Sequence, residues 1–311
     1  MGQRWQAVGL AWVLGAGLSC ADLCVPGEPG CGPDPGQGGS VGVAGGAARV
    51  TLEPSGAVSG CPAGRYYVNR VQGRMVDLQG RPIPRAQVNV CGNACIPGTA
   101  DNEGRFDIAV DLCFGTNAEY PHGAVLWFSG NRRYADLFFD FNQRGMQRVG
   151  LARIETPLAV PAMADGGNAY VPSGSRGIVR MVDGLGFSLT ISPDNIEYPL
   201  TAEDETVRVV RVDPTRLPFT PEERPDVMYA IEPADSRLRE PAPAEFPNTR
   251  RLPPGTEVDI VGVGNHISRG RPATGVLGRI DMGHVSDDGR VVVPDHGLRF
   301  LGMVGWRALR R

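Results

Sequence analysis

Lysine is absent from the chain of 311 residues, and all 31 basic residues are arginines. We interpret this bias as a sign of a GC-rich genome and not of 31 separately selected guanidinium sites. The net charge of −3 lacks the positive excess with which proteins bind phosphate backbones, so no nucleic-acid partner is expected. With 41% hydrophobic and 21% charged residues the composition is that of an ordinary globular protein, and the length suits about two domains.

The N-terminus also lacks a hydrophobic run long enough for a permanent transmembrane helix. The apolar segment from Ala7 to Leu18 follows Arg4 and has about the length of a signal-peptide core. The sequence therefore predicts export, with residues 1–19 as a signal peptide.

A cysteine follows this segment directly, in the sequence "GLSC". The sequence resembles a bacterial lipobox, which implies that Cys20 becomes the acylated first residue and anchors the protein stably in a membrane. Lipoboxes usually carry leucine three places before the cysteine, where this chain has Gly17, so cleavage by signal peptidase I behind Ser19 remains the alternative. We expect a lipid-anchored protein of the outer membrane or cell surface, or a periplasmic or secreted one if Cys20 is not acylated.

Residues 20–64 are expected to form a flexible linker. In residues 25–40, ten of sixteen residues are Gly or Pro, and nothing apolar offsets the entropy cost of ordering such a segment. The sequence "ARVTLEP" at residues 48–54 is consistent with a short strand or with loose packing.

The remaining cysteines number six, an even count that suits disulfides in an oxidising compartment. These disulfide candidates are Cys24, Cys31, Cys61, Cys91, Cys95 and Cys113. A bond between Cys24 and Cys31 would close a small loop in the linker, and the other four allow three pairings. Because "CGNAC" is the only close pair among these six, we expect no zinc site.

The stretch "QGRMVDLQGRPIPRAQVNV", residues 72–90, contains short apolar runs broken by turn residues. Val88 and Val90 alternate with polar residues, as half-buried strands do, and so do Phe106 and Ile108. Between these two segments, "DNEG" provides side chains that bond a turn backbone and a glycine that tolerates positive φ. The sequence predicts consecutive antiparallel strands.

The pattern resembles the carboxypeptidase regulatory-like domain, a transthyretin-like β-sandwich. It is carried by Gly73, Asp77, Gly80, Pro82, Ile83, Ala86, Val88, Val90, Asp101, Gly104 and Phe106. Met75 replaces the usual valine, and Arg85 replaces a glycine, which disturbs only a turn. The resemblance implies a seven-stranded sandwich over residues 65–155, completed by strands in "GAVLWFSG", "ADLFFDFNQRG" and "MQRVGLARI".

In metallocarboxypeptidases this module accompanies a catalytic domain with an H-x-x-E zinc motif. None of the four histidines of this chain has a glutamate three residues further on. They are His122, His266, His284 and His296. The resemblance therefore implies a spacer or interaction domain without the catalytic half.

Residues 156–311 continue with strand patterns. Phe187, Leu189 and Ile191 alternate with hydroxyl residues, and "TVRVVRV", "VMYAI", "TEVDIVGV", "GRVVV" and "RFLGMVGW" are further expected strands. The order resembles a ZU5-like domain with C-terminal hairpins. The matching residues are Leu189, Thr190, Ile191, Pro193, Tyr229, Phe246, Pro247, Asn248, Leu252, Pro253, Pro254, Gly255 and Thr256. The expected fold is all-β, with two β-sandwich-like domains in tandem.

The candidate catalytic and cofactor motifs do not match the patterns that such sites require. Ser175 in "PSGSRG" has Ser173 where a nucleophile elbow needs glycine, which favours a turn. "GVGNH", ending at His266, lacks the third glycine of a dinucleotide fingerprint. We expect no catalytic residue and no cofactor.

Two acidic clusters resemble metal sites but match hairpin turns better. The first comprises Asp281, His284, Asp287 and Asp288, and the second Asp101, Asn102 and Glu103, without EF-hand spacing. We expect no metal at either. Aromatic residues that are candidates for stacking on sugars are Tyr66, Tyr67, Trp127, Tyr134 and Trp306, although core positions are the favoured interpretation.

The sequence thus predicts a non-catalytic, membrane-anchored cell-envelope protein that acts as a structural or interaction module. Its expected partners are the membrane and an envelope protein or polysaccharide. The alternative is an accessory carbohydrate- or peptide-binding subunit of an envelope enzyme or transporter. An exposed row of aromatic residues would favour the alternative, and polar sheet faces would favour the first hypothesis.

Overall fold

The computed structural model describes residues 48–56, 60–130, 133–163, 170–171, 177–199, 206–269 and 272–309. All of them belong to the compact unit Val41–Arg311. The expected signal peptide, Cys20, Cys24, Cys31 and Ser175 lie outside these residues. No helix in the described part of the chain is long and apolar enough to cross a membrane.

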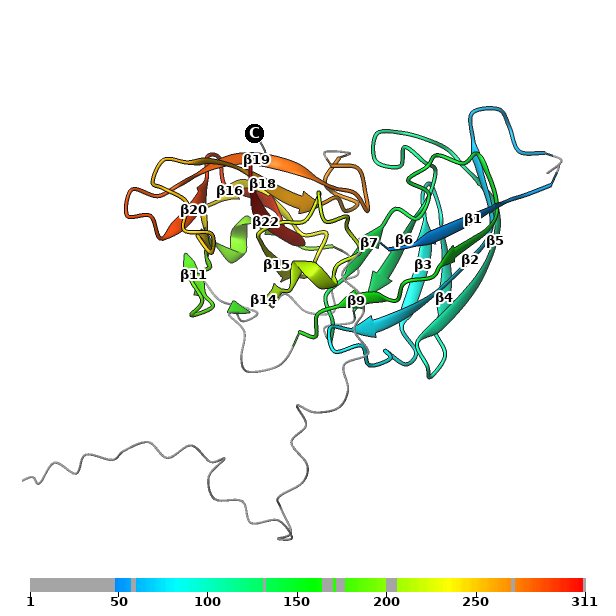
Figure 1. The fold of residues 1–311 in the computed structure, drawn as a ribbon, viewed down its shortest axis with the longest axis horizontal. Helices are drawn as coiled ribbons and strands as arrows, with labels where there is room; N and C mark the ends of the chain where they lie inside the picture. The colour runs from blue at the N-terminus through cyan, green and yellow to red at the C-terminus, as the bar shows by residue number, and fades with distance from the viewer. Residues whose placement is uncertain are drawn as a thin grey trace, which may run out of the picture. The chain divides into compact units, whose positions relative to one another are not determined.

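The described structure is built almost entirely of β-strands, which confirms the expected all-β class (Figure 1). Its helical segments are short 3₁₀ turns, among them η3 (Pro193–Asn195) and η4 (Pro214–Arg216).

Two sheets form the N-terminal sandwich. The first has the order β1 (Val50–Pro54), β8 (Arg148–Ile154), β2 (Tyr66–Asp77) and β5 (Arg105–Phe114), with β9 (Leu158–Val160) also paired to β2. The second has the order β4 (Cys95–Thr99), β3 (Gln87–Cys91), β6 (Val125–Ser129) and β7 (Leu137–Phe139). The three strands expected after residue 122 are present as β6, β7 and β8, and β1 and β9 extend the sheet beyond residues 65–155.

Alternation in the sequence produces the sandwich core. Phe106, Ile108 and Val110 of β5 are buried while the residues between them are exposed. Gly73 lies opposite Phe106 in the pairing of β2 with β5, and a Cβ at Gly73 would meet the phenyl ring at 2.5 Å. This glycine therefore leaves the space in which Phe106 packs.

The C-terminal part contains one large sheet and one small sheet. The large sheet has the order β10 (Tyr170–Val171), β14 (Val207–Val212), β15 (Val227–Glu232), β22 (Met303–Ala308), β18 (Glu257–Val263), β19 (Leu277–Val285), β20 (Val291–Pro294), β17 (Ala244–Pro247), β12 (Ser188–Ile191) and β11 (Val179–Val182). The small sheet has the order β13 (Ile196–Glu197), β16 (Arg237–Ala242) and β21 (Leu298–Phe300).

Aromatic side chains fill the core of this part. Phe187 stacks on Tyr229 with ring centroids 4.3 Å apart, and Phe246 packs beside both. Trp306 is fully buried, and its indole N–H donates to the carbonyl oxygen of Pro247 at 3.1 Å. The predicted inward positions Phe187, Leu189 and Ile191 are all buried.

The sandwich and the C-terminal strands share one hydrophobic cluster. Phe138 of β7 belongs to it together with Val261 of β18 and Met303 of β22. The backbone N–H of Asp140 donates to the carbonyl oxygen of Gly275 at 3.2 Å, where a Cβ on residue 275 would approach the Asp140 nitrogen to 2.5 Å. The two parts therefore contact each other closely, beyond the connection through the chain.

The described cysteines form two disulfide bonds. Cys61 bonds to Cys113 with a Cα–Cα distance of 5.8 Å, and Cys91 bonds to Cys95 with 4.0 Å. Cys91 and Cys95 face each other in the pairing of β3 with β4. Among the three pairings that the sequence allows, the structure contains this one.

Candidate functional site

The first acidic cluster from the sequence does not converge on one point. His284 contacts Asp295 at 2.9 Å, whereas Asp281 contacts His296. Asp288 accepts the hydroxyl of Ser286 at 2.7 Å in the turn between β19 and β20. Asp287 is exposed in the same turn.

The second cluster also forms a turn. The Asp101 carboxylate accepts the backbone N–H groups of Glu103 and Arg105 at 2.9 and 2.8 Å, and Gly104 has φ +73°. These contacts satisfy the turn backbone as the sequence predicts. Across the described residues, His, Cys, Asp and Glu side chains form no group of three or more that is arranged to hold a metal ion.

Each of the four histidines places Nδ1 beside an aspartate carboxylate. The pairs are His122 with Asp140 (2.7 Å), His266 with Asp235 (2.7 Å), His284 with Asp295 (2.9 Å) and His296 with Asp281 (2.9 Å). Sequence analysis missed these partners because they are 11 to 31 residues apart and meet only when strands pair. "GVGNH" runs out of strand β18, so its glycines do not form a phosphate loop before a helix.

The candidate aromatic residues are not arranged as an exposed row. Trp306 and Tyr67 are buried, and the Tyr67 hydroxyl donates to Asp111 at 2.6 Å. Trp127 is half-buried and stacks on Phe138 with ring centroids 6.0 Å apart. Tyr66 and Tyr134 are half-buried as well. The large hydrophobic residues exposed in the described segments are aliphatic: Ile178, Val182, Leu185 and Leu309.

Two carboxyl groups are enclosed where the sandwich meets strand β15. Glu232 accepts the backbone N–H groups of Asp136, at 2.8 Å, and of Ala234. Asp136 accepts the N–H of Gly130 at 2.8 Å and the indole N–H of Trp127 at 3.2 Å. Burial raises the pKa of Asp136 to about 6. Burial first, and the charge of Asp136 second, raise the pKa of Glu232 well above its ordinary value.

This carboxyl pair has little space beside it for chemistry. The hollow that Asp136 lines has a volume of about 10 Å³. That is room for about one water molecule, far below the several hundred Å³ of a typical ligand site. A pair of carboxyl groups so enclosed does not have access to a sugar or peptide substrate.

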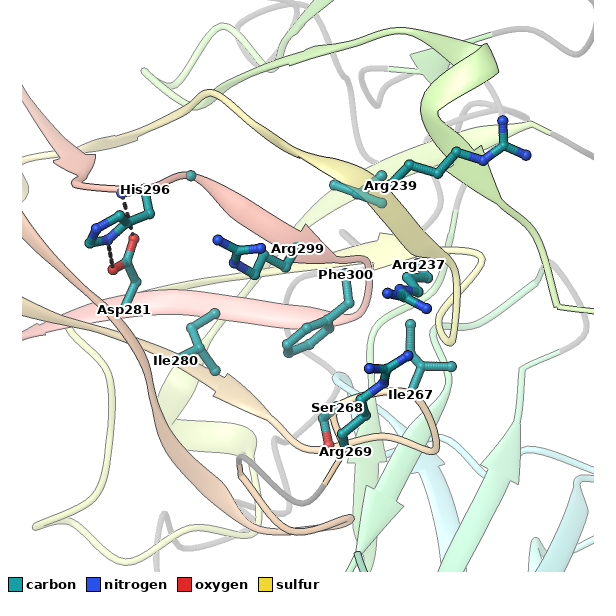
Figure 2. A pocket seen from close by; sticks show the side chains of 12 residues that line it. Arg237, Arg239, Ile267, Ser268, Arg269, Ile280, Asp281, His296, Arg299 and Phe300 are labelled. Carbon is teal, nitrogen blue, oxygen red and sulfur yellow. Dashed lines mark hydrogen bonds and ion pairs between the residues drawn. The ribbon is translucent and has the colours of Figure 1, made fainter.

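A larger groove lies on the small sheet and its neighbours (Figure 2). It has a volume of about 550 Å³, within the range of small-molecule sites. Its lining residues come from β16, β19, β21, the segment after β18 and the turn between β20 and β21. They include Arg237, Arg239, Ile267, Arg269, Ile280, Asp281, His296 and Arg299.

Strand periodicity explains why arginines line this groove. In β16, Arg237 and Arg239 are exposed while Leu238 between them is buried. In β21, Arg299 is exposed between buried Leu298 and Phe300. The sequences "RLR" and "LRF" thus indicate arginines exposed on a sheet, since alternation places these arginines on its outer face.

The groove is lined by more positively than negatively charged side chains. Four arginines line it against one carboxylate, that of Asp281. That carboxylate is already occupied, because it accepts the backbone N–H of His296 at 2.9 Å and contacts the imidazole (Figure 2). Arg239 pairs with Glu197 at 3.2 Å.

The other three groove arginines, Arg237, Arg269 and Arg299, make no ion pair with any described residue. Guanidinium groups without acidic partners in a hollow favour an anion, because a planar guanidinium donates two parallel hydrogen bonds to a carboxylate or phosphate. The groove is therefore the best candidate binding site in the described structure.

A second hollow, of about 780 Å³, lies at the sandwich and includes Arg85 and Arg133 in its lining. Arg85 has φ +55°, at the place where the family pattern carries glycine. The turn expected there is present, and the arginine adopts its left-handed conformation.

Comparison of the chain with models of protein families, with curated proteins and with solved structures finds no match.

Proposed function

We propose that the protein is a non-catalytic, membrane-anchored component of the cell envelope that acts as an interaction module. The observation that carries this proposal is the open groove with three arginines that have no acidic partner among the described residues. A groove of this kind can hold a ligand through charge and hydrogen bonds. The described residues around it include no recognisable nucleophile with its base.

The location in the envelope is supported by the sequence "GLSC" and by the cysteines. The two disulfide bonds fit an oxidising compartment outside the cytoplasm. On this proposal, Cys20 holds the chain in the outer membrane and the Gly/Pro-rich segment separates the anchor from the folded part. The carboxypeptidase regulatory-like and ZU5-like patterns are consistent with such a role.

The alternative, an accessory carbohydrate- or peptide-binding subunit of an enzyme or transporter, is less favoured. Stacking on neutral sugars needs exposed aromatic rings, and the exposed large hydrophobic side chains of the described segments are all aliphatic.

Co-sedimentation tests the proposal. The full chain, extracted in detergent, is mixed with insoluble envelope material from cells that lack the protein. We expect saturable co-sedimentation and no release of soluble sugars or peptides from the material over time. An absence of binding contradicts the interaction module, and time-dependent release of fragments contradicts its non-catalytic nature.

A further inference from the structure

We propose that the arginine groove binds an acidic polysaccharide, a polymer of sugars that carries carboxylate groups at intervals. This inference rests on the proposed function and specifies its ligand. It depends on three properties of the groove: its excess charge, the separation of its cations, and its position on a sheet face.

The excess charge selects an anionic ligand. Arg237, Arg269 and Arg299 are exposed, and no described acidic side chain neutralises them. Placing three such cations around one hollow costs repulsion that an anionic ligand relieves. Because guanidinium remains charged at all physiological pH values, the site is permanently cationic.

The separation of the cations selects a polymer over a single small anion. The three arginines without an ion pair come from three separate segments: Arg237 lies on β16, Arg299 on β21 and Arg269 on the segment after β18. Arg299 is on neighbouring β21 and lies between His296 and Arg237 in Figure 2. A compact phosphate group needs donors that converge on one point, whereas in Figure 2 the guanidinium group of Arg299 lies apart from those of Arg237 and Arg269.

The position on a sheet face favours a sugar chain over an acidic peptide. Extended peptides bind to sheets through main-chain hydrogen bonds at an open edge. β21 is an edge strand of the small sheet, but the arginines of β16 and β21 project from the sheet face and not along that edge. The half-buried side chains of Ile267 and Ile280 lie among them. Aliphatic side chains next to guanidinium groups suit the C–H faces and carboxylates of uronic-acid residues.

Binding assays with defined polymers test this inference. The full chain in detergent is titrated with polygalacturonate, neutral dextran, polyglutamate, and mixed micelles that contain an anionic phospholipid. We expect polygalacturonate to bind, neutral dextran not to bind, and polyglutamate and the micelles to bind at least about tenfold more weakly. The affinity for polygalacturonate should fall with rising salt, since the contacts are ionic.

The matched variants are Arg237→Gln with Arg299→Gln, and Arg105→Gln with Arg148→Gln. Both pairs remove two exposed strand arginines and change the net charge equally. We expect the groove variant to lose at least about tenfold in affinity, because it removes two guanidinium groups that form charge-assisted hydrogen bonds with the ligand. The control variant should change affinity less than about twofold, with thermal unfolding unaltered in both.

Four outcomes contradict the inference. They are no binding of polygalacturonate, equal binding of polyglutamate, equal binding of the anionic micelles, and equal losses in the two variants. If one of the first three occurs while the wild-type chain still co-sediments with envelope material, the proposed interaction module stands and only its ligand class is wrong. Equal losses in the two variants would show instead that the groove is not the binding site. If co-sedimentation also fails, the proposed function is wrong.

Discussion

At the scale of single residues, the most unusual groups are the enclosed carboxyls of Asp136 and Glu232. Burial is the main cause of the raised pKa of Asp136; of the weaker effects of charge, that of Asp235 raises this pKa and that of His266 lowers it. Burial outweighs both, so the native state holds protons that the unfolded chain has already released. The native state therefore binds more protons than the unfolded state between about pH 4 and pH 6.

We expect stability to fall as the pH rises through this window. An acid whose pKa is raised in the native state stabilises the fold fully at a pH below its ordinary, unfolded pKa, and this contribution is lost as the pH rises through the native pKa. The native pKa is about 6 for Asp136 and well above the ordinary value for Glu232. The loss should be on the order of 2–3 kcal/mol. Urea unfolding between pH 4 and pH 8 measures it.

Glu232→Gln should flatten this pH dependence, because it removes one of the two coupled acids. The control is Glu257→Gln, which alters an exposed glutamate at the start of β18. An equally steep decline in Glu232→Gln and in the wild type would show that the carboxyl pair does not cause the pH dependence.

Contacts within turns could be predicted from the sequence, whereas contacts between residues far apart in the chain could not. Asp101 and Gly104 could be assigned to a turn because their contacts lie within four residues. The partners of Asp136 and His266 could not be assigned, because Glu232 and Asp235 are 96 and 31 residues away. Such pairs depend on sheet topology, which the sequence does not specify locally.

At the scale of elements, the strands with regular alternation were predictable and the irregular ones were not. β5, β12, β14 and β18 appear where the sequence predicts them. β16 and β17 were missed because "RLREPAPAEFP" contains three prolines and several charged residues and has no sustained apolar face. The arginine groove was missed for the same reason, since it lies on β16.

The two disulfides should differ in their effect on stability. Cys61–Cys113 spans 52 residues and Cys91–Cys95 spans four. Because loop-closure entropy grows with loop length, we expect Cys61→Ala with Cys113→Ala to cost about 4 kcal/mol, and Cys95→Ala about 2 kcal/mol. Denaturant unfolding under oxidising conditions compares them, and a larger cost for Cys95→Ala would refute the entropic explanation.

At the scale of the whole molecule, the described part is one folded unit that contains the groove, and the membrane anchor at Cys20 is our proposal. Composition and alternation were enough to predict the all-β class. They were not enough to predict that residues of both halves share one hydrophobic cluster, because that depends on side chains as distant as Phe138 and Met303.

Anchoring can be tested separately from binding. We expect labelled fatty acid to be incorporated into the wild-type protein and not into Cys20→Ala, because only the acylated cysteine carries the lipid. Recovery of the wild type as a soluble protein with an unmodified N-terminus would contradict lipidation and favour cleavage by signal peptidase I.

The most direct test of the central claim is photocrosslinking in intact cells. A photoreactive residue replaces Arg239 at the groove or, as a control, Arg105 on the exposed face of β5. We expect irradiation to attach envelope polysaccharide to the chain from position 239 and not from position 105. No adduct at position 239, or the same adducts from both positions, would contradict the claim that the groove is where this protein meets its partner.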